Sequence, residues 1–268
     1  MEVTGTVSHY KDGAFFVITL AGKKLNSLTL GDYMELVRLM READQDDEVL
    51  FTVFQGHGKM FSAGGNVESF SRVSVEGNNR VAELMRHPTS PVLLFGNTFA
   101  THSKVTVACL NGPAYGLSAA FVLMCDLVYA MNDQIYLELP FASLALGPEG
   151  ALSDTLPGLL GRHMSNRSLI LGDRIPYAAL EGKLFPGHYG LQDPEEFNRR
   201  VLGELREHLK TMDRTTLMGT KRLLQERTRP AWLAANATEA HNALNNFVRG
   251  VPQQRFFDVT QRIRKSKL

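Results

Sequence analysis

The sequence predicts an α/β fold that ends in a helical region. Short apolar and β-branched runs alternate with helical patterns over the first two thirds of the 268 residues, which is typical of parallel β-α units. Strand signals end after about residue 195, and helical patterns alone follow. We therefore divide the chain into a core of residues 1–194 and a C-terminal helical region of residues 195–268.

The elements of the core follow one another in a regular order. The run Lys11-Asp12-Gly13 separates two apolar stretches and indicates a hairpin turn. A helix over 30–43 is amphipathic, with Tyr33, Leu36, Val37 and Met40 on one stripe. A long helical segment that starts near residue 81 is interrupted by Pro88 and Pro91. Strands are predicted over 4–8, 14–20, 49–55, 104–110, 127–131 and 134–138.

The helical region contains four separate helical patterns. They cover 195–210, 214–227, 231–248 and 253–264. No heptad or fixed repeat runs through them, so a coiled coil or a repeat array is disfavoured. Trp232, Leu233, Phe247, Phe256 and Phe257 supply large apolar side chains, which would leave exposed patches on a monomer.

Composition is typical of a globular protein. Hydrophobic residues make up 44% of the chain, and the formal net charge of +1 argues against a nucleic-acid surface. Cys109 and Cys125 lie in apolar runs without metal-ligand spacing, so we expect buried free thiols. The eight histidines form no metal motif, and no apolar stretch is long enough to span a membrane. We therefore expect no metal site and no membrane span.

Two glycine-bearing segments stand at the ends of predicted strands. The segment 61–67 reads Phe-Ser-Ala-Gly-Gly-Asn-Val and lies in a loop after the strand over 49–55. The segment 111–117 reads Asn-Gly-Pro-Ala-Tyr-Gly-Leu and opens a buried helix after the strand over 104–110. Glycines there allow close approach to a ligand, and the first N–H groups of a helix have no internal partner. A ligand oxygen that gains negative charge would suit such donors.

Together these two segments resemble the crotonase, or enoyl-CoA hydratase/isomerase, superfamily. The first is similar to its Phe-x-x-Gly-Ala-Asp loop and the second to its Asn-Gly-x-Ala-x-Gly-Gly helix start. The resemblance implies a spiral of β-β-α units and an acyl-CoA substrate. It implies an oxyanion hole made by the backbone N–H groups of Gly65 and Leu117. The acyl-CoA-binding positions that it implies are Ala63, Gly64, Gly65, Asn66, Val67 and Leu117.

One glutamate distinguishes this chain from the family's hydratases. The two hydratase glutamate positions hold Ala120 and, within Leu139-Pro140-Phe141, no acid. The segment around Glu149 is similar to the Thr-Glu-Gly-Gly segment of the fungal peroxisomal Δ3-Δ2-enoyl-CoA isomerases, whose glutamate is the sole acid/base. Leu144, Leu146, Ala151 and Leu152 surround it in sequence, and apolar surroundings would raise a carboxyl pKa. Taken without the resemblance, Glu149 equally suits a first-turn helix residue that favours the helix dipole.

The resemblance predicts a Δ3-Δ2-enoyl-CoA isomerase of fatty-acid β-oxidation. One carboxylate would move a proton from C2 to C4 through a dienolate, with coenzyme A as part of the substrate and no separate cofactor. The alternatives are a Δ3,5-Δ2,4-dienoyl-CoA isomerase, which calls for a further acidic group, and a catalytically silent acyl-CoA binder. In the family the helical region builds trimers, so a homotrimer or homohexamer is expected.

The sequence finishes on Ser266, Lys267 and Leu268. This tripeptide in that position is a receptor-read peroxisomal address. We therefore expect an import receptor as a partner and the peroxisomal matrix as the location.

Overall fold

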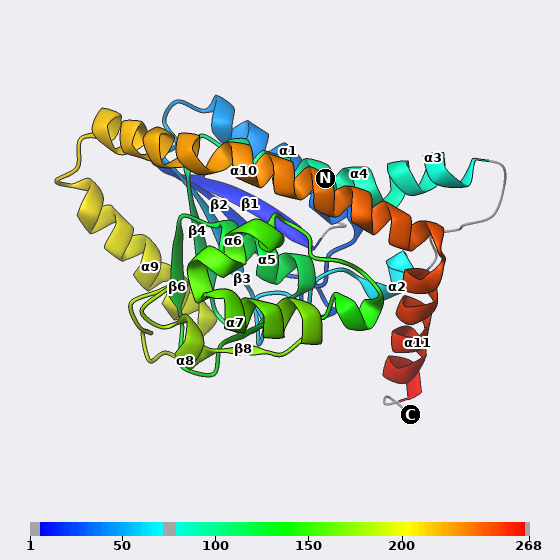
Figure 1. Ribbon diagram of the computed structural model, residues 1–268. Helices are drawn as coiled ribbons and strands as arrows, with labels where there is room; N and C mark the ends of the chain where they lie inside the picture. The colour runs from blue at the N-terminus through cyan, green and yellow to red at the C-terminus, as the bar shows by residue number, and fades with distance from the viewer. Residues whose placement is uncertain (1–5, 72–78, 266–268) are drawn as a thin grey trace.

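The computed structural model describes residues 6–71 and 79–265, and in it two sheets are wrapped by helices (Figure 1). The core contains β1 (Val7–Asp12), β2 (Phe15–Leu20), α1 (Leu30–Gln45), β3 (Phe51–Gly56), α2 (Val67–Phe70), α3 (Arg80–Leu84), α4 (Ser90–Thr101), β4 (Val105–Leu110), β5 (Ala114–Tyr115), α5 (Gly116–Met124), β6 (Leu127–Ala130), β7 (Tyr136–Glu138), α6 (Leu152–Leu160), α7 (Arg162–Asn166), β8 (Ile175–Pro176) and α8 (Tyr177–Leu180). The helical region contains α9 (Pro194–Leu209), α10 (Arg214–Val248) and α11 (Val251–Lys265).

The larger sheet has the strand order β1-β2-β3-β4-β6. The expected hairpin pairs β1 with β2 antiparallel, and the other neighbours are parallel. Every residue of β3 and β4 is buried, as their continuous apolar runs predict for strands covered on both faces. The smaller sheet has the order β5-β7-β8. Its strand β5 leads directly into α5, and this places the start of α5 at the sheet edge.

Helix α1 shows how the sequence sets an element boundary. Thr29 caps it, and the side chain of Asp32 accepts a hydrogen bond from the Thr29 N–H at 2.8 Å. This reciprocal capping box satisfies two N–H groups that the helix leaves unpaired. Tyr33, Leu36 and Met40 are fully buried, so the predicted apolar stripe faces the core.

The break that we predicted between residues 227 and 231 is wrong. Helix α10 is one element of 35 residues that continues through Pro230. A proline inside a helix typically costs about 3 kcal/mol, because it lacks an N–H and its ring crowds the preceding turn. Helix α10 packs against α4, α6 and α3, so tertiary contacts on both sides of Pro230 hold it in one piece.

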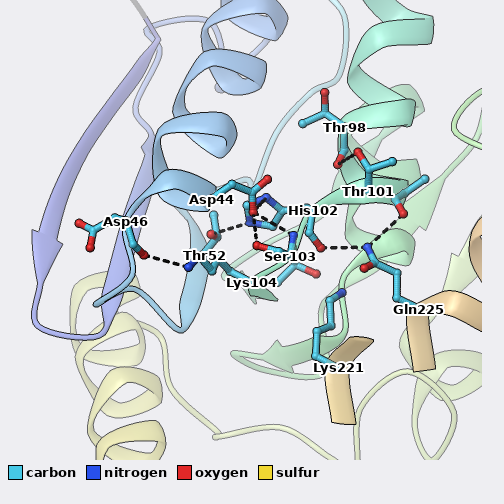
Figure 2. Close-up of polar contacts among 12 residues, drawn as sticks. Asp44, Asp46, Thr52, Thr98, Thr101, His102, Ser103, Lys104, Lys221 and Gln225 are labelled. Carbon is cyan, nitrogen blue, oxygen red and sulfur yellow. Dashed lines mark hydrogen bonds and ion pairs between the residues drawn. The ribbon is translucent and has the colours of Figure 1, made fainter. Parts of the chain in front are cut away.

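Polar side chains fix the first half of α10 to the core. Gln225 donates to the carbonyl oxygens of Ala100 and His102 at 3.0 and 2.9 Å (Figure 2). Lys221 forms an ion pair with Asp126 at 2.7 Å, and Asp126 also accepts from the N–H of Thr106. Asp126 therefore joins α10 to β4, which is the structural role that its position at a strand start indicates.

Helix α11 turns back against α2 beside the end of α10 (Figure 1). The rings of Phe70 and Phe256 stack with centroids 5.4 Å apart, and Phe247 joins the same small cluster. Phe247 and Phe256 are only 2% and 4% exposed, so the expectation that they would form an open patch on a monomer is wrong. The chain itself covers them. Phe257, in contrast, remains exposed.

Candidate active site

The two glycine-bearing segments lie side by side. The N–H of Phe61 donates to the carbonyl of Pro113 at 3.1 Å, and the N–H of Tyr115 donates to the carbonyl of Ser62 at 3.0 Å. The hydroxyls of Ser62 and Ser118 are 2.8 Å apart. These contacts join the loop after β3 to the start of α5, so residues far apart in sequence form one wall.

Gly64 allows this close approach. Its φ is +78°, and a Cβ atom there would lie 2.6 Å from the carbonyl oxygen of Tyr115. Both facts exclude a side chain without movement of one segment. The glycine is therefore needed to bring Gly65 next to the start of α5.

The N–H groups of Gly65 and Leu117 are placed as potential donors. Gly65 forms a parallel bridge with Leu28, in which Leu28 donates to the carbonyl of Gly64 and Asn66 donates to the carbonyl of Leu28. This pattern turns the N–H of Gly65 away from Leu28. Leu117 lies in the first turn of α5, where N–H groups have no acceptor within the helix.

The predicted site residues line one cavity of about 850 Å³. Its wall includes Ala63, Gly64, Gly65, Asn66, Val67, Leu117 and Glu149. Apolar side chains from α2, α10 and α11 line much of the remainder, among them Phe70, Phe247 and Phe256. Asn66 has a second role, because its side chain accepts from the N–H groups of Glu68 and Ser69 and caps α2. The cavity therefore combines an apolar enclosure with convergent backbone donors, which is typical of a ligand site.

Glu149 is the carboxylate of this cavity whose pKa is raised most clearly. It lies just before α6, and burial together with the charge of Glu239 raises its pKa from 4.5 to about 8. Removal from water disfavours the charged form, and a nearby like charge adds to this effect. A carboxyl group with this pKa is a stronger base than an exposed glutamate and holds a proton near neutral pH.

Glu239 is a site residue that the sequence did not reveal. It lies on α10, is 5% exposed and lines the same cavity. Its carboxylate accepts from the N–H groups of Ala151 and Ser153, each at 2.7 Å, and from the Ser153 hydroxyl at 2.6 Å. In the sequence it is one glutamate in a long helical pattern. The only available signal was that it shares the helix face of Asn236, Ala240 and Ala243, which is otherwise uncharged.

Tyr33 is a second such residue. It belongs to the apolar stripe of α1, yet it lines the cavity, and its hydroxyl is buried close to Ser118. Burial raises its pKa above the ordinary value, with a further contribution from the charge of Glu149. The phenol therefore stays protonated and is a donor beside Glu149. The sequence predicted Tyr33 as a core residue of the apolar stripe. Its burial is confirmed, but the place of its hydroxyl on the cavity wall was not predicted.

Glu138 also lines the cavity, but Arg174 neutralises it. The guanidinium Nε lies 2.6 Å from the Glu138 carboxylate and stands over the ring of Tyr136. The hydroxyls of Tyr136 and Tyr115 are 2.7 Å apart. The Glu138 carboxylate is therefore held in an ion pair, whereas Glu149 is enclosed by burial.

The two positions that hold glutamates in hydratases are closed to that role here. Ala120 is fully buried under the segment that carries Glu149, and a Cβ atom at Gly150 would lie 3.1 Å from it. A larger side chain at position 120 would displace that segment. Phe141 is buried in the core and lines the cavity with carbon atoms only.

A hydroxyl, an imidazole and a carboxylate also align outside the cavity. His102 lies with Nε2 2.8 Å from the Thr52 hydroxyl and Nδ1 3.0 Å from Asp44 (Figure 2). Thr52 and His102 have no exposed surface, and neither lines the cavity. No substrate could reach this cluster, so it joins α1, β3 and the end of α4 rather than acting as a hydrolytic triad.

The chain is similar in sequence to known proteins over most of its length. A family model described as "Enoyl-CoA hydratase/isomerase" matches residues 11–182. The chain is 35% identical to the Δ3,5-Δ2,4-dienoyl-CoA isomerase of Saccharomyces cerevisiae, over 99% of this chain and 100% of that protein. The chain belongs to the enoyl-CoA hydratase/isomerase family. Within this family it is also similar to the 3,2-trans-enoyl-CoA isomerase of S. cerevisiae, at 33% identity over 98% of this chain and 96% of that protein.

Solved structures confirm the crotonase fold. OdaA of Pseudomonas aeruginosa has a TM-score of 0.81 at 22% identity, with 96% of this chain and 99% of that chain covered. The enoyl-CoA hydratase of Bacillus halodurans also has a TM-score of 0.81, at 21% identity, with 95% and 100% covered. At this level of identity the likeness concerns the fold alone.

The described parts of the chain contain neither a metal cluster nor a membrane-spanning helix. Residues 6–71 and 79–265 contain no group of three histidine, cysteine, aspartate or glutamate side chains that could hold a metal ion. In the same ranges no helix is both long and apolar enough for a membrane span. Cys109 and Cys125 are free thiols, as predicted, and the expected burial is confirmed for Cys109, whereas Cys125 is only partly buried.

Proposed function

We propose that this family member is a Δ3-Δ2-enoyl-CoA isomerase, which converts 3-enoyl-CoA to 2-trans-enoyl-CoA in fatty-acid β-oxidation. The observation that carries the proposal is that Glu149 lines the same cavity as Gly65 and Leu117, whose N–H groups are potential donors. The absence of a carboxylate at Ala120 and at Phe141 argues against hydration, because the two positions that carry the acids in the family's hydratases carry none here.

The proposed reaction needs one proton carrier. The ionised carboxylate of Glu149 removes a proton from C2 of the substrate, and the electron pair moves to the thioester oxygen to form a dienolate. The N–H groups of Gly65 and Leu117 donate to that oxygen as it becomes negative. Loss of one such donor typically costs about 3–4 kcal/mol in the barrier. Glu149 then returns the proton to C4, and the double bond lies between C2 and C3.

No separate cofactor enters this mechanism, because coenzyme A is part of the substrate. The cavity accepts the acyl portion among Phe70, Phe247, Phe256 and neighbouring apolar groups. Ala63, Asn66 and Val67 stand on the wall beside Gly65 and are proposed to contact the thioester end.

A dienoyl-CoA isomerase is a second candidate, and one observation favours it. That reaction moves a proton over a longer conjugated path and calls for a further acidic group. Glu239 supplies a second buried carboxylate in the cavity besides Glu149. A full-length relative also carries this activity in its name.

Turnover of three substrates by the purified protein separates these functions. We expect conversion of 3-enoyl-CoA, weaker conversion of 3,5-dienoyl-CoA, and little hydration of 2-enoyl-CoA. Faster conversion of the dienoyl substrate would favour the second candidate. Binding of all three without turnover would identify a catalytically silent acyl-CoA binder.

We propose a homotrimer or homohexamer as the assembly. The support is the family membership together with exposed apolar side chains at Ile170, Leu171, Leu223 and Leu224, each more than 60% exposed. Such side chains on a monomer are typical of interaction surfaces. Light scattering at micromolar concentration should give at least three times the chain mass, and a monomer would refute the assembly.

We propose the peroxisomal matrix as the location, through an import receptor that binds Ser266, Lys267 and Leu268. These residues lie outside the described part of the structure, so the support is the tripeptide itself and a mouse relative named "Enoyl-CoA delta isomerase 3, peroxisomal". Deletion of Leu268 should move the protein to the cytosol in cells that lack a wild-type copy, with activity unchanged. Continued import would contradict the proposal.

A further inference from the structure

A carboxylate on α10 holds the segment that follows the proposed base. Glu239 accepts three hydrogen bonds from Ala151 and Ser153, although it is 88 residues from Ala151 in sequence. The N–H of Ala151 is buried, and an unpaired buried N–H would cost roughly 1–3 kcal/mol. Glu239 therefore satisfies donors at the start of α6 that no helical carbonyl reaches.

The backbone of this segment needs an external restraint. Gly150 and Ala151 both have positive φ, at +74° and +61°. A left-handed conformation costs an L-residue such as Ala151 roughly 1–2 kcal/mol. The hydrogen bonds to Glu239 offset this cost and define the direction in which Glu149 enters the cavity.

Contacts between α10 and α4 hold the part of α10 that carries Glu239 in place. Almost one turn earlier, Asn236 donates to the carbonyl of Leu93 at 3.0 Å and to the side chain of Asn97 at 2.9 Å. A Cβ atom at Gly96 would lie 2.6 Å from the Asn236 side chain, so α10 and α4 are in close contact there. Movement of Glu239 would require movement of both helices.

The charged and titratable groups around the site are few. The charge of Glu239 acts on Glu149, the charge of Glu149 acts on the hydroxyl of Tyr33, and Asp154 acts on Glu239. Glu138 lies on the cavity wall in its ion pair with Arg174. Lys23 and Lys24 line the cavity, and Lys24 is bonded to Glu68 at 2.8 Å. Glu239 is therefore the charge that most directly affects Glu149.

We infer that Glu239 is a positioning residue, which fixes the 149–153 segment and thereby aims the Glu149 carboxylate at the substrate. This inference rests on the proposed function. It also decides how the second carboxylate of the cavity acts, since all three partners of Glu239 are donors to it. Burial raises the pKa of Glu239, whereas its three hydrogen bonds favour the ionised form and hold the carboxylate in place. A proton carrier, in contrast, must be free to gain and lose a proton in each cycle.

The test compares Glu239→Gln with two matched variants. Glutamine keeps the size of the side chain but removes the charge and turns an NH₂ group toward N–H donors. Ser153→Ala keeps the charge and removes one of the three hydrogen bonds. Glu226→Gln removes an exposed carboxylate from the same helix and serves as the control. Each variant is assayed for kcat, KM and the pH dependence of kcat/KM with 3-enoyl-CoA and 3,5-dienoyl-CoA.

We expect Glu239→Gln to lower kcat on both substrates by about 10-fold to 100-fold, since misplacement of a catalytic group by about 1 Å costs this much, while KM changes little. The acid limb of kcat/KM should move to lower pH, because a like charge beside Glu149 is lost. Ser153→Ala should lower kcat by a smaller factor and leave the acid limb in place. Glu226→Gln should match the wild type.

Amide hydrogen exchange without substrate provides a readout that does not depend on activity. The N–H groups of Ala151 and Ser153 should exchange at least about tenfold faster in Glu239→Gln than in Glu226→Gln. Wild-type kcat and unchanged exchange in Glu239→Gln would overturn the inference. Selective loss of dienoyl turnover would also overturn it, because Glu239 would then carry a proton. If Glu239→Gln does not fold, the test rests on Ser153→Ala. A wild-type kcat in Ser153→Ala would then overturn the inference.

This design separates the two proposals. If the wild-type protein turns over no enoyl-CoA, the proposed function fails, and the exchange experiment alone still decides whether Glu239 holds the segment. If the wild-type protein is active and exchange in Glu239→Gln is unchanged, the function stands and the positioning role fails.

Discussion

The two walls of the cavity are built in different ways. The wall with Gly65 and Leu117 consists of two short segments, one in the loop after β3 and one at the start of α5, and it works through backbone N–H groups. The wall with Glu149 works through a side chain whose pKa is raised by burial and by the charge of Glu239, which lies far away in the sequence. The comparison shows that the proposed oxyanion hole is a local feature of the chain, whereas the proposed base is a product of the whole fold.

The largest expected effect falls on the side-chain wall. Glu149→Gln should lower isomerase turnover by about 10²–10⁴-fold, because glutamine keeps the size but cannot carry a proton. Acyl-CoA affinity should change little, so the loss appears in kcat rather than in KM. Steady-state kinetics and a binding isotherm for an acyl-CoA measure the two quantities. Glu138→Gln is the control, and a greater loss in that variant would move the base to β7.

A substitution that disturbs the wall with Gly65 and Leu117 should lower activity almost as much. Gly64→Ala introduces a Cβ atom that would lie 2.6 Å from the Tyr115 carbonyl. We expect kcat/KM to fall by about 10²-fold, as for loss of one oxyanion donor. Gly58→Ala is the matched control, because Gly58 also has a positive φ of +75° but open space around its Cβ position. Equal activity of the two variants would show that the approach of the segments is unimportant.

The pH dependence of kcat/KM should report on the Glu149 wall alone, because the backbone N–H groups of the other wall do not titrate. Glu149 must be ionised to take a proton, and its pKa in the free protein is about 8. We therefore expect kcat/KM to rise about tenfold per pH unit up to this pKa and then to level off. A profile that is already flat at pH 6 would contradict the raised pKa.

Stability should change in the opposite sense to activity. The Glu149 pKa is near 4.5 in the unfolded chain and about 8 in the folded chain, so the folded state binds more protons between these values. The free energy of unfolding therefore falls as pH rises through this window. Glu149→Gln removes the effect and should be more stable than the wild type at pH 8, by a few kcal/mol at most. Thermal unfolding at pH 5 and pH 8 measures this, and an equal difference at both values would refute it.

The wall with Gly65 and Leu117 could be predicted from the sequence because glycines and turn residues affect the backbone locally. The positive φ of Gly64 and the first turn of α5 follow from a few neighbouring residues. The hairpin, the strands and the stripe of α1 were predictable for the same reason. The continuity of α10 through Pro230 was not, since tertiary contacts override a local helix breaker there. Glu239 and the hydroxyl of Tyr33 were missed because their roles depend on which helices pack around the cavity.

The most direct test of the account is the fate of the proton itself. A 3-enoyl-CoA deuterated at C2 is converted in ordinary water by the wild-type protein in a single turnover, and the product is analysed by mass spectrometry and NMR. One enclosed carboxylate that removes and returns the same proton should place deuterium at C4 of the 2-enoyl product. Solvent hydrogen alone at C4 would contradict transfer by Glu149 as the single carrier.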